Sequence, residues 1–124
     1  MSKRIYALKM RPMSEELLAL LAEKFRMLSD PTRLTILRAL MHNGEKTVSQ
    51  IVLETGQSVA NISKHLKQLA SGGLLARRKE GSFVNNRLDD PVVEKICELA
   101  CDSLQRNLEQ QLCRTAKALR KKRN

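Results

Sequence analysis

Aromatic residues are scarce in this sequence: they make up 2% of its 124 residues, and tryptophan is absent. Proteins that bind single-stranded nucleic acids without sequence preference usually stack the bases on several exposed rings. Only Tyr6, Phe25 and Phe83 could supply rings here, and they lie far apart in the chain. A single-strand binding platform built from stacked aromatics is therefore not expected.

Long apolar runs are also missing. The longest one, Leu17 to Ala22, is far shorter than the roughly 20 residues that a membrane-spanning helix needs. The basic segment before Ser14 contains no apolar stretch of signal-peptide length. The sequence predicts a soluble cytoplasmic protein with no membrane partner.

Cysteines number only three, at positions 97, 101 and 113. This odd and uneven set does not suit a disulfide framework, so a reducing compartment is expected. Neither His42 nor His65 stands in a catalytic spacing to a cysteine, and no glycine-rich phosphate loop is present. The sequence therefore predicts that the protein is not an enzyme.

Acidic residues are in deficit: 13 of them stand against 23 Lys and Arg, giving a formal charge of +10 and a pI near 10.0. The deficit is sharpest between Gln57 and Lys79, where five basic residues occur with no acidic one. Such an excess makes a polyanion the first partner to consider. The chain is long enough for one domain, and 42% of its residues are hydrophobic. We therefore expect a single packed domain that binds a polyanion.

Apolar residues at helical spacing predict five helices, each with start and stop signals. The expected N-caps of the five helices are Ser14, Asp30, Thr47, Ser58 and Asp90. A short helix, a turn containing Gly56 and a second helix form a helix-turn-helix pattern. The runs 74–79 and 83–88 alternate like strands around a Glu-Gly-Ser turn, which predicts a β-hairpin. The predicted fold is therefore mainly α with a small hairpin: a winged helix-turn-helix with five helices and a two-stranded wing.

The fourth helix carries the best candidates for contacts with duplex DNA. If Ile62, Leu66 and Leu69 face the core, its polar side chains lie on the other face. Asn and Gln amides can bind adenine edges, a small Ala can approach a thymine methyl, and Ser, Lys and His can bind phosphates or bases. The alternative is an ordinary solvated face. The hairpin adds two candidates and the start of the third helix adds one. The predicted DNA contacts are Thr47, Ser58, Ala60, Asn61, Ser63, Lys64, His65, Lys67, Gln68, Arg78 and Lys79.

The last helix has an apolar stripe that continues from Val92 to Leu119. A small globule rarely needs so long a stripe, so part of it is expected to contact a second copy of the chain. Residues 114–124 carry six basic side chains and no acidic one, and they are expected to form a solvated, partly disordered tail. The predicted organisation is an N-terminal arm at 1–13, a DNA-binding and dimerisation domain at 14–113, and this basic tail.

Four segments together resemble one known family: residues 29–37 (SDPTRLTIL), 58–69 (SVANISKHLKQL), 73–75 (GLL) and 78–81 (RKEG). They are similar to the ArsR/SmtB family of bacterial winged-helix repressors, and the resemblance covers about residues 15–105. It implies a homodimer paired through the first and last helices, with two recognition helices in successive major grooves and repression relieved by a signal. By this resemblance the fourth helix contacts bases and phosphates, and Arg78 and Lys79 are the wing contacts.

The chain departs from the family at its sensor positions. Residues 47–55, where metal-sensing members carry a cysteine-rich box, contain no Cys, His or Asp, and the last helix contains no histidine. Two aromatic residues that are common in the second wing strand are replaced by Asn85 and Asn86. The two metal sites that the family uses at these places are therefore not expected here.

Cys97 and Cys101 are the remaining candidate sensor. Their i, i+4 spacing places two thiols on one helix face, too far apart for an unstrained disulfide but close enough to share a soft metal or an arsenite-like centre. Cys113 lies off that face, so a third ligand would come from elsewhere. The alternative is that these cysteines are ordinary small core residues.

These observations predict a sequence-specific regulator that binds duplex DNA at an inverted repeat, acts as a repressor and is released by a signal. No cofactor follows from the sequence, apart from the thiophilic metal or metalloid that Cys97 and Cys101 could hold. Two alternatives stay open: a winged-helix module that binds a protein or structured RNA, and a constitutive DNA-binding protein without a sensor.

Overall fold

The computed structural model describes residues 12–42 and 44–123, which form two compact units that divide after Leu88. Nearly all of the predicted N-terminal arm lies outside the described residues. Within the described residues, no helix is both long enough and apolar enough to cross a lipid bilayer.

The first unit begins with two helices, α2 (Glu15–Leu28) and α3 (Pro31–Leu40). The predicted caps are confirmed: the Ser14 hydroxyl accepts a hydrogen bond from the Leu17 amide at 3.1 Å, and the Asp30 carboxylate accepts one from the Arg33 amide at 3.0 Å. The bond from the Arg33 amide lowers the pKa of Asp30 below its usual value, because it stabilises the charged carboxylate.

The helix-turn-helix follows as α4 (Val48–Thr55) and α5 (Val59–Ser71). Thr47 and Gln50 form a capping box at the start of α4, with the Thr47 amide donating to the Gln50 side chain at 2.9 Å. Gly56 ends α4 with a φ of 73°, in the left-handed region that favours glycine. The Ser58 side chain then caps α5 by accepting a bond from the Asn61 amide.

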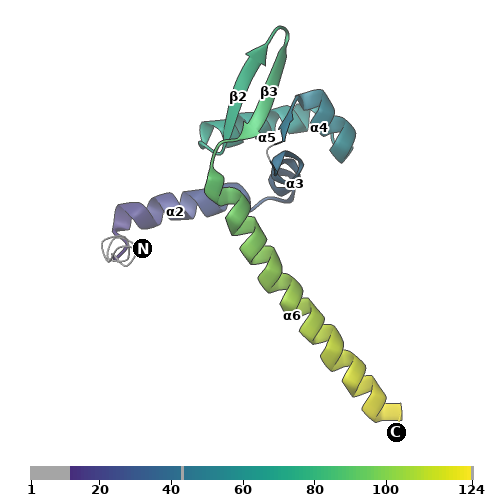
Figure 1. Ribbon diagram of the computed structural model, residues 1–124. Helices are drawn as coiled ribbons and strands as arrows, with labels where there is room; N and C mark the ends of the chain where they lie inside the picture. The colour runs from purple at the N-terminus through teal and green to yellow at the C-terminus, as the bar shows by residue number, and fades with distance from the viewer. Residues whose placement is uncertain (1–11, 43, 124) are drawn as a thin grey trace. The chain divides into compact units, whose positions relative to one another are not determined.

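The wing is the hairpin of β2 (Leu75–Glu80) and β3 (Phe83–Leu88) (Figure 1). A third strand, β1 (Glu45–Lys46), was not predicted, because two residues are too short to show any alternation. It pairs antiparallel with the outer side of β3 and gives the strand order β1-β3-β2. The wing therefore supplies two strands of a three-stranded sheet, with β3 in the middle and β2 at one edge.

Asn86 is the buried polar residue that joins these three strands. Its side-chain oxygen accepts a bond from Arg77 Nε at 3.0 Å, and its amide nitrogen donates to the carbonyls of Lys46 and Val84. A buried amide is tolerated when its hydrogen bonds are satisfied in this way. Asn86 thereby ties the three strands together through side-chain hydrogen bonds.

The core of the first unit is aliphatic, and α5 contributes its central face. Ile62, Leu66 and Leu69 are fully buried, as the spacing predicted, and α5 packs against α3, α4 and β2. The other fully buried aliphatic side chains of this unit are Ile36, Leu37, Leu40 and Ile51, and Leu74 is almost so. Burying three side chains of α5 fixes the rotation of that helix about its own axis, and therefore which residues face solvent.

The second unit consists of one helix, α6 (Pro91–Arg123), which runs without interruption (Figure 1). The Asp90 carboxylate accepts a bond from the Val92 amide at 3.0 Å, which supports its predicted role at the start of this helix. The expectation of a partly disordered tail is wrong in its secondary structure, because the helix continues to Arg123. Helix-forming Ala, Leu, Lys and Arg dominate this segment, and no Gly or Pro interrupts it.

Candidate nucleic-acid interface

The outward face of α5 is polar, basic and free of carboxylates. Ser58, Ala60, Lys64 and Lys67 are exposed, as predicted from the positions of the buried residues. Ser63 is half-buried, and Thr47 is half-buried at the start of α4, where its hydroxyl accepts a hydrogen bond from the Gln50 amide. The structure therefore brings the basic and small residues of α5 together on a surface that could approach a duplex.

Asn61 is held by its neighbour Gln57. The Asn61 amide nitrogen donates to the Gln57 side-chain oxygen at 2.7 Å. One N–H and the carbonyl oxygen of Asn61 remain, and these are the groups that pair with the edge of an adenine. The sequence analysis missed Gln57, which orients Asn61 from the residue before the cap of α5.

His65 and Gln68 each use one polar atom in a hydrogen bond with Arg33 of α3, so that atom is not available for DNA. Arg33 Nε donates to His65 Nδ1 at 3.3 Å, and Arg33 Nη2 donates to the Gln68 side-chain oxygen at 2.7 Å. Nε2 is the ring nitrogen of His65 that this contact leaves for another partner, and Gln68 keeps its amide nitrogen.

The wing presents Arg77, Arg78 and Lys79 on the exposed part of β2. Arg78 is engaged by two carboxylates: its Nε lies 3.0 Å from Glu45 Oε1 and its Nη2 lies 3.3 Å from Glu80 Oε2. The pKa of Arg78 is raised above its usual value, chiefly because the Glu45 carboxylate accepts a hydrogen bond from its guanidinium group. The predicted wing cation is therefore paired within the protein, with carboxylates where a DNA phosphate would bind.

Two exposed apolar side chains near this surface were missed by the sequence analysis. Val59 is 58% exposed in the first turn of α5, and Phe83 is 62% exposed beside the turn of the wing. Val59 lies three residues before buried Ile62, yet it stays exposed in the first turn of the helix. Apolar side chains at such places can contact thymine methyl groups or the floor of a groove.

The described residues include no group of three or more His, Cys, Asp or Glu that could hold a metal ion. Cys97 is half-buried, while Cys101 and Cys113 are exposed, and all three are free thiols. Burial, together with the neighbouring Cys101, raises the pKa of the Cys97 thiol. One copy of α6 thus offers at most the two thiols that lie one turn apart.

The Arg33 contacts lead to a first prediction. Replacing Arg33 with Ala removes the donor that orients His65 and Gln68, and we expect the affinity for duplex DNA to fall by about tenfold, since hydrogen bonds from charged groups contribute roughly 1.5–3 kcal/mol. Arg38→Ala is the matched control, because it removes an exposed arginine from the same helix. Fluorescence anisotropy with labelled duplex DNA measures the affinity of both variants. Equal losses in the two variants would show that only net charge matters.

The Arg78 contacts lead to a second prediction. Replacing Glu45 with Gln removes a carboxylate that competes with phosphate, and we expect DNA affinity to rise by about two- to fivefold, in line with the small free energy of an exposed ion pair. Glu23→Gln changes the net charge equally but breaks an ion pair with Arg26 on α2 instead. Affinities are compared at one salt concentration. If Glu23→Gln raised the DNA affinity as much as Glu45→Gln does, the idea that Glu45 competes with phosphate for Arg78 would be wrong.

Comparison with known proteins gives one consistent family. Residues 30–77 match the model of the bacterial regulatory protein, arsR family. The chain is 38% identical over 78 residues to an uncharacterised HTH-type transcriptional regulator of Methanocaldococcus jannaschii, covering 63% of this chain and 88% of the relative. It is 36% identical over 99 residues to the arsenical resistance operon repressor of Escherichia coli, covering 72% and 85%.

A solved structure agrees with these relatives. The homodimeric winged helix-turn-helix DNA-binding domain of a Mycobacterium bovis protein superposes with a TM-score of 0.66 at 30% identity, covering 89% of this chain and 93% of that chain. The matched proteins are transcriptional regulators and not enzymes. The predicted winged-helix fold and the predicted resemblance are thereby confirmed. The chain belongs to the ArsR family of bacterial regulatory proteins and is a DNA-binding transcriptional regulator.

Proposed function

We propose that the chain is a homodimeric repressor that binds an inverted-repeat operator in duplex DNA through α5 and the wing. The observation that carries this proposal is the outward face of α5. It places Ala60, Lys64 and Lys67 toward solvent on a helix whose other face is buried, and the segment from Gln57 to Lys79 contains no carboxylate. A phosphate backbone is the partner that such a surface suits best.

The side chains divide into two roles. Lys64 and Lys67 are exposed cations on flexible stems, which neutralise phosphates whatever the base sequence. Asn61 is held by Gln57 at the N-terminal end of α5 and is the group best placed to distinguish bases. Ser58, Ser63 and Thr47 supply hydroxyls near helix N-termini, and Arg78 and Lys79 bind the backbone from the wing. Ala60, His65 and Gln68 complete the proposed contact surface.

The homodimer and the inverted repeat are supported by the homodimeric M. bovis domain. Two symmetry-related recognition helices contact half-sites about 34 Å apart, one turn of duplex, and the operator then has the symmetry of the protein. Because a DNA-binding regulator acts where the DNA is, we infer a cytoplasmic location.

We further propose that Cys97 and Cys101 form the sensor that releases the operator. They provide two thiols one turn apart on α6, and soft thiolates select thiophilic metals and metalloids. The E. coli relative is named for arsenical resistance, which supports a ligand of this class. A third ligand would come from a second copy of the chain.

The proposed roles of Lys64 and Asn61 give a third prediction. We expect Lys64→Ala to weaken binding to every duplex and to lower the slope of log affinity against log salt by about one. We expect Asn61→Ala to change the preferred base at one position of each half-site, with a cost of about 1–3 kcal/mol on the preferred sequence only. Binding to a randomised operator library, sequenced after selection, measures both. If both variants weaken binding uniformly, or neither shows any sequence preference, the base-reading role of Asn61 is wrong.

The proposed sensor gives a fourth prediction. Sodium arsenite should release operator DNA from the unmodified protein but not from the Cys97→Ser/Cys101→Ser variant. Cys113→Ser is the matched control, since it removes an exposed thiol of the same helix and should respond as the unmodified protein does. Operator release is followed by anisotropy under reducing conditions. Unaltered release from the double variant would leave the chain a DNA-binding protein whose cysteines are not the sensor.

A further inference from the structure

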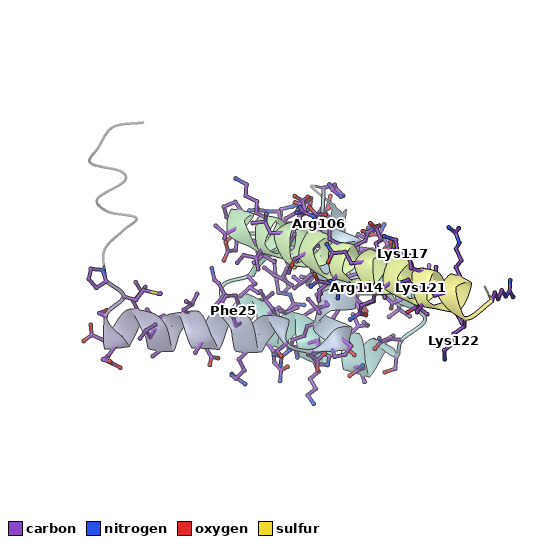
Figure 2. All side chains as sticks on the ribbon, turned by 90° about the horizontal axis from the view of Figure 1, so that it is seen from below. Phe25, Arg106, Arg114, Lys117, Lys121 and Lys122 are labelled. Carbon is purple, nitrogen blue, oxygen red and sulfur yellow. The ribbon has the colours of Figure 1, made fainter. Side chains whose placement is uncertain are left out.

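From Arg106 onward, helix α6 carries a line of basic side chains that the proposed operator contacts do not use. Successive residues of an α-helix are turned by about 100° around its axis. Counted from Arg106, the side chains of Lys117, Lys121 and Arg114 lie at about 20°, 60° and 80°. We call these four residues the basic stripe, and Figure 2 labels all of them along α6.

The basic stripe has no counter-charge of its own. All four side chains are exposed, and no carboxylate of the described residues forms an ion pair with them. The carboxylates of α6, at positions 94, 98, 102 and 109, lie between about 240° and 320° on the same count. Lys117 has a like charge three residues before it and another four residues after it, which is unfavourable in an isolated helix. The basic stripe therefore suits a polyanionic partner.

The exposed leucines of α6 lie on the other side of the helix. They lie between about 160° and 240° on the same count, and their exposed fractions are 67%, 57%, 62% and 59% for Leu104, Leu108, Leu112 and Leu119. A partner that covered these leucines would therefore leave the basic stripe in water. A lipid surface that took up the leucines would likewise have the stripe pointing away from its headgroups, so an anionic membrane fits the stripe poorly.

The dimensions of the basic stripe suit duplex DNA. Its ends are 15 residues apart, which corresponds to about 22 Å along the helix axis. A duplex carries one negative charge per about 1.7 Å of its axis, so a row of cations this long faces several phosphates at once. Arg and Lys bind phosphates without reading the bases. The polyanion that a DNA-binding regulator already holds is therefore a partner that the stripe fits.

We infer that the basic stripe binds the phosphate backbone of the duplex that flanks the operator, whatever the base sequence there. DNA held by α5 supplies flanking duplex at a high effective concentration, because α5 and the stripe belong to one chain. This inference rests on the proposed binding of operator by α5 and adds a second contact that does not depend on sequence. The affinity should then depend on how far the duplex extends beyond the operator.

Duplexes of two lengths test this contact in the full-length protein. The short duplex contains only the operator selected from the randomised library, and the long duplex adds about 20 base pairs of arbitrary sequence on each side, well over the length of the stripe. We expect the unmodified protein to bind the long duplex about tenfold more tightly at one salt concentration. Arg114→Ala/Lys117→Ala should remove most of this gain, and lower the slope of log affinity against log salt on the long duplex by about two.

The same alanine variant should bind the short duplex as the unmodified protein does, which also shows that it is folded. Lys122→Ala/Arg123→Ala is the matched control, because it removes equal charge from the same helix at about 160° and 260°, outside the basic stripe. It should keep the preference for the long duplex. Arg114→Lys/Lys117→Arg retains both charges and should bind both duplexes as the unmodified protein does.

The outcomes separate this inference from the proposed function. Equal losses on the long duplex in the two alanine variants would show that total charge matters and not this face, and would overturn the inference. A protein that binds the short duplex but gains nothing from flanking DNA would leave the repressor intact and reject the stripe as a DNA contact. Failure of the unmodified protein to bind the short duplex would instead contradict the operator binding on which the inference rests.

Vesicles of phosphatidylglycerol provide the test against a membrane partner. We expect Arg114→Ala/Lys117→Ala to change vesicle binding no more than Lys122→Ala/Arg123→Ala does. If the stripe variant lost vesicle binding and kept its affinity for the long duplex, the surface would belong to lipid and the inference would be wrong.

Discussion

The burial of one face of α5 is the constraint on which the interface depends. Ile62, Leu66 and Leu69 are fully enclosed where α5 packs against α3, α4 and β2. Rotating the helix about its axis would expose these side chains and bury Lys64 or Lys67, which costs hydrophobic free energy and strands a charge in the core. The packing of these aliphatic side chains therefore determines which polar residues of α5 face solvent.

A second level of organisation is polar and local. Gln57 holds Asn61, Arg33 holds His65 and Gln68, and two carboxylates hold Arg78. These contacts give the side chains defined positions before any ligand arrives, which reduces the conformational entropy that binding would otherwise cost. At the wing, a phosphate that bound Arg78 would have to displace these two carboxylates. Exposed ion pairs are weak enough for such an exchange.

The two units divide the work of a regulator. The first contains the helix-turn-helix and the wing, and the second is a single helix with several exposed leucines and all three cysteines of the chain. The proposed operator contacts and the proposed sensor thiols therefore belong to different units of the chain.

The sequence by itself determined the helices, the turn at Gly56, the hairpin, the buried face of α5 and the resemblance to the family. These features depend on residues a few positions apart, where periodicity and capping act locally. It did not yield β1, whose two residues become a strand only because β3 lies beside them, or the helical state of residues 114–123. Only the tertiary structure decided that Arg33 holds His65 and Gln68 and that Glu45 pairs with Arg78, since each contact joins residues more than 30 positions apart. Such contacts follow from packing of whole elements, and no local pattern encodes them.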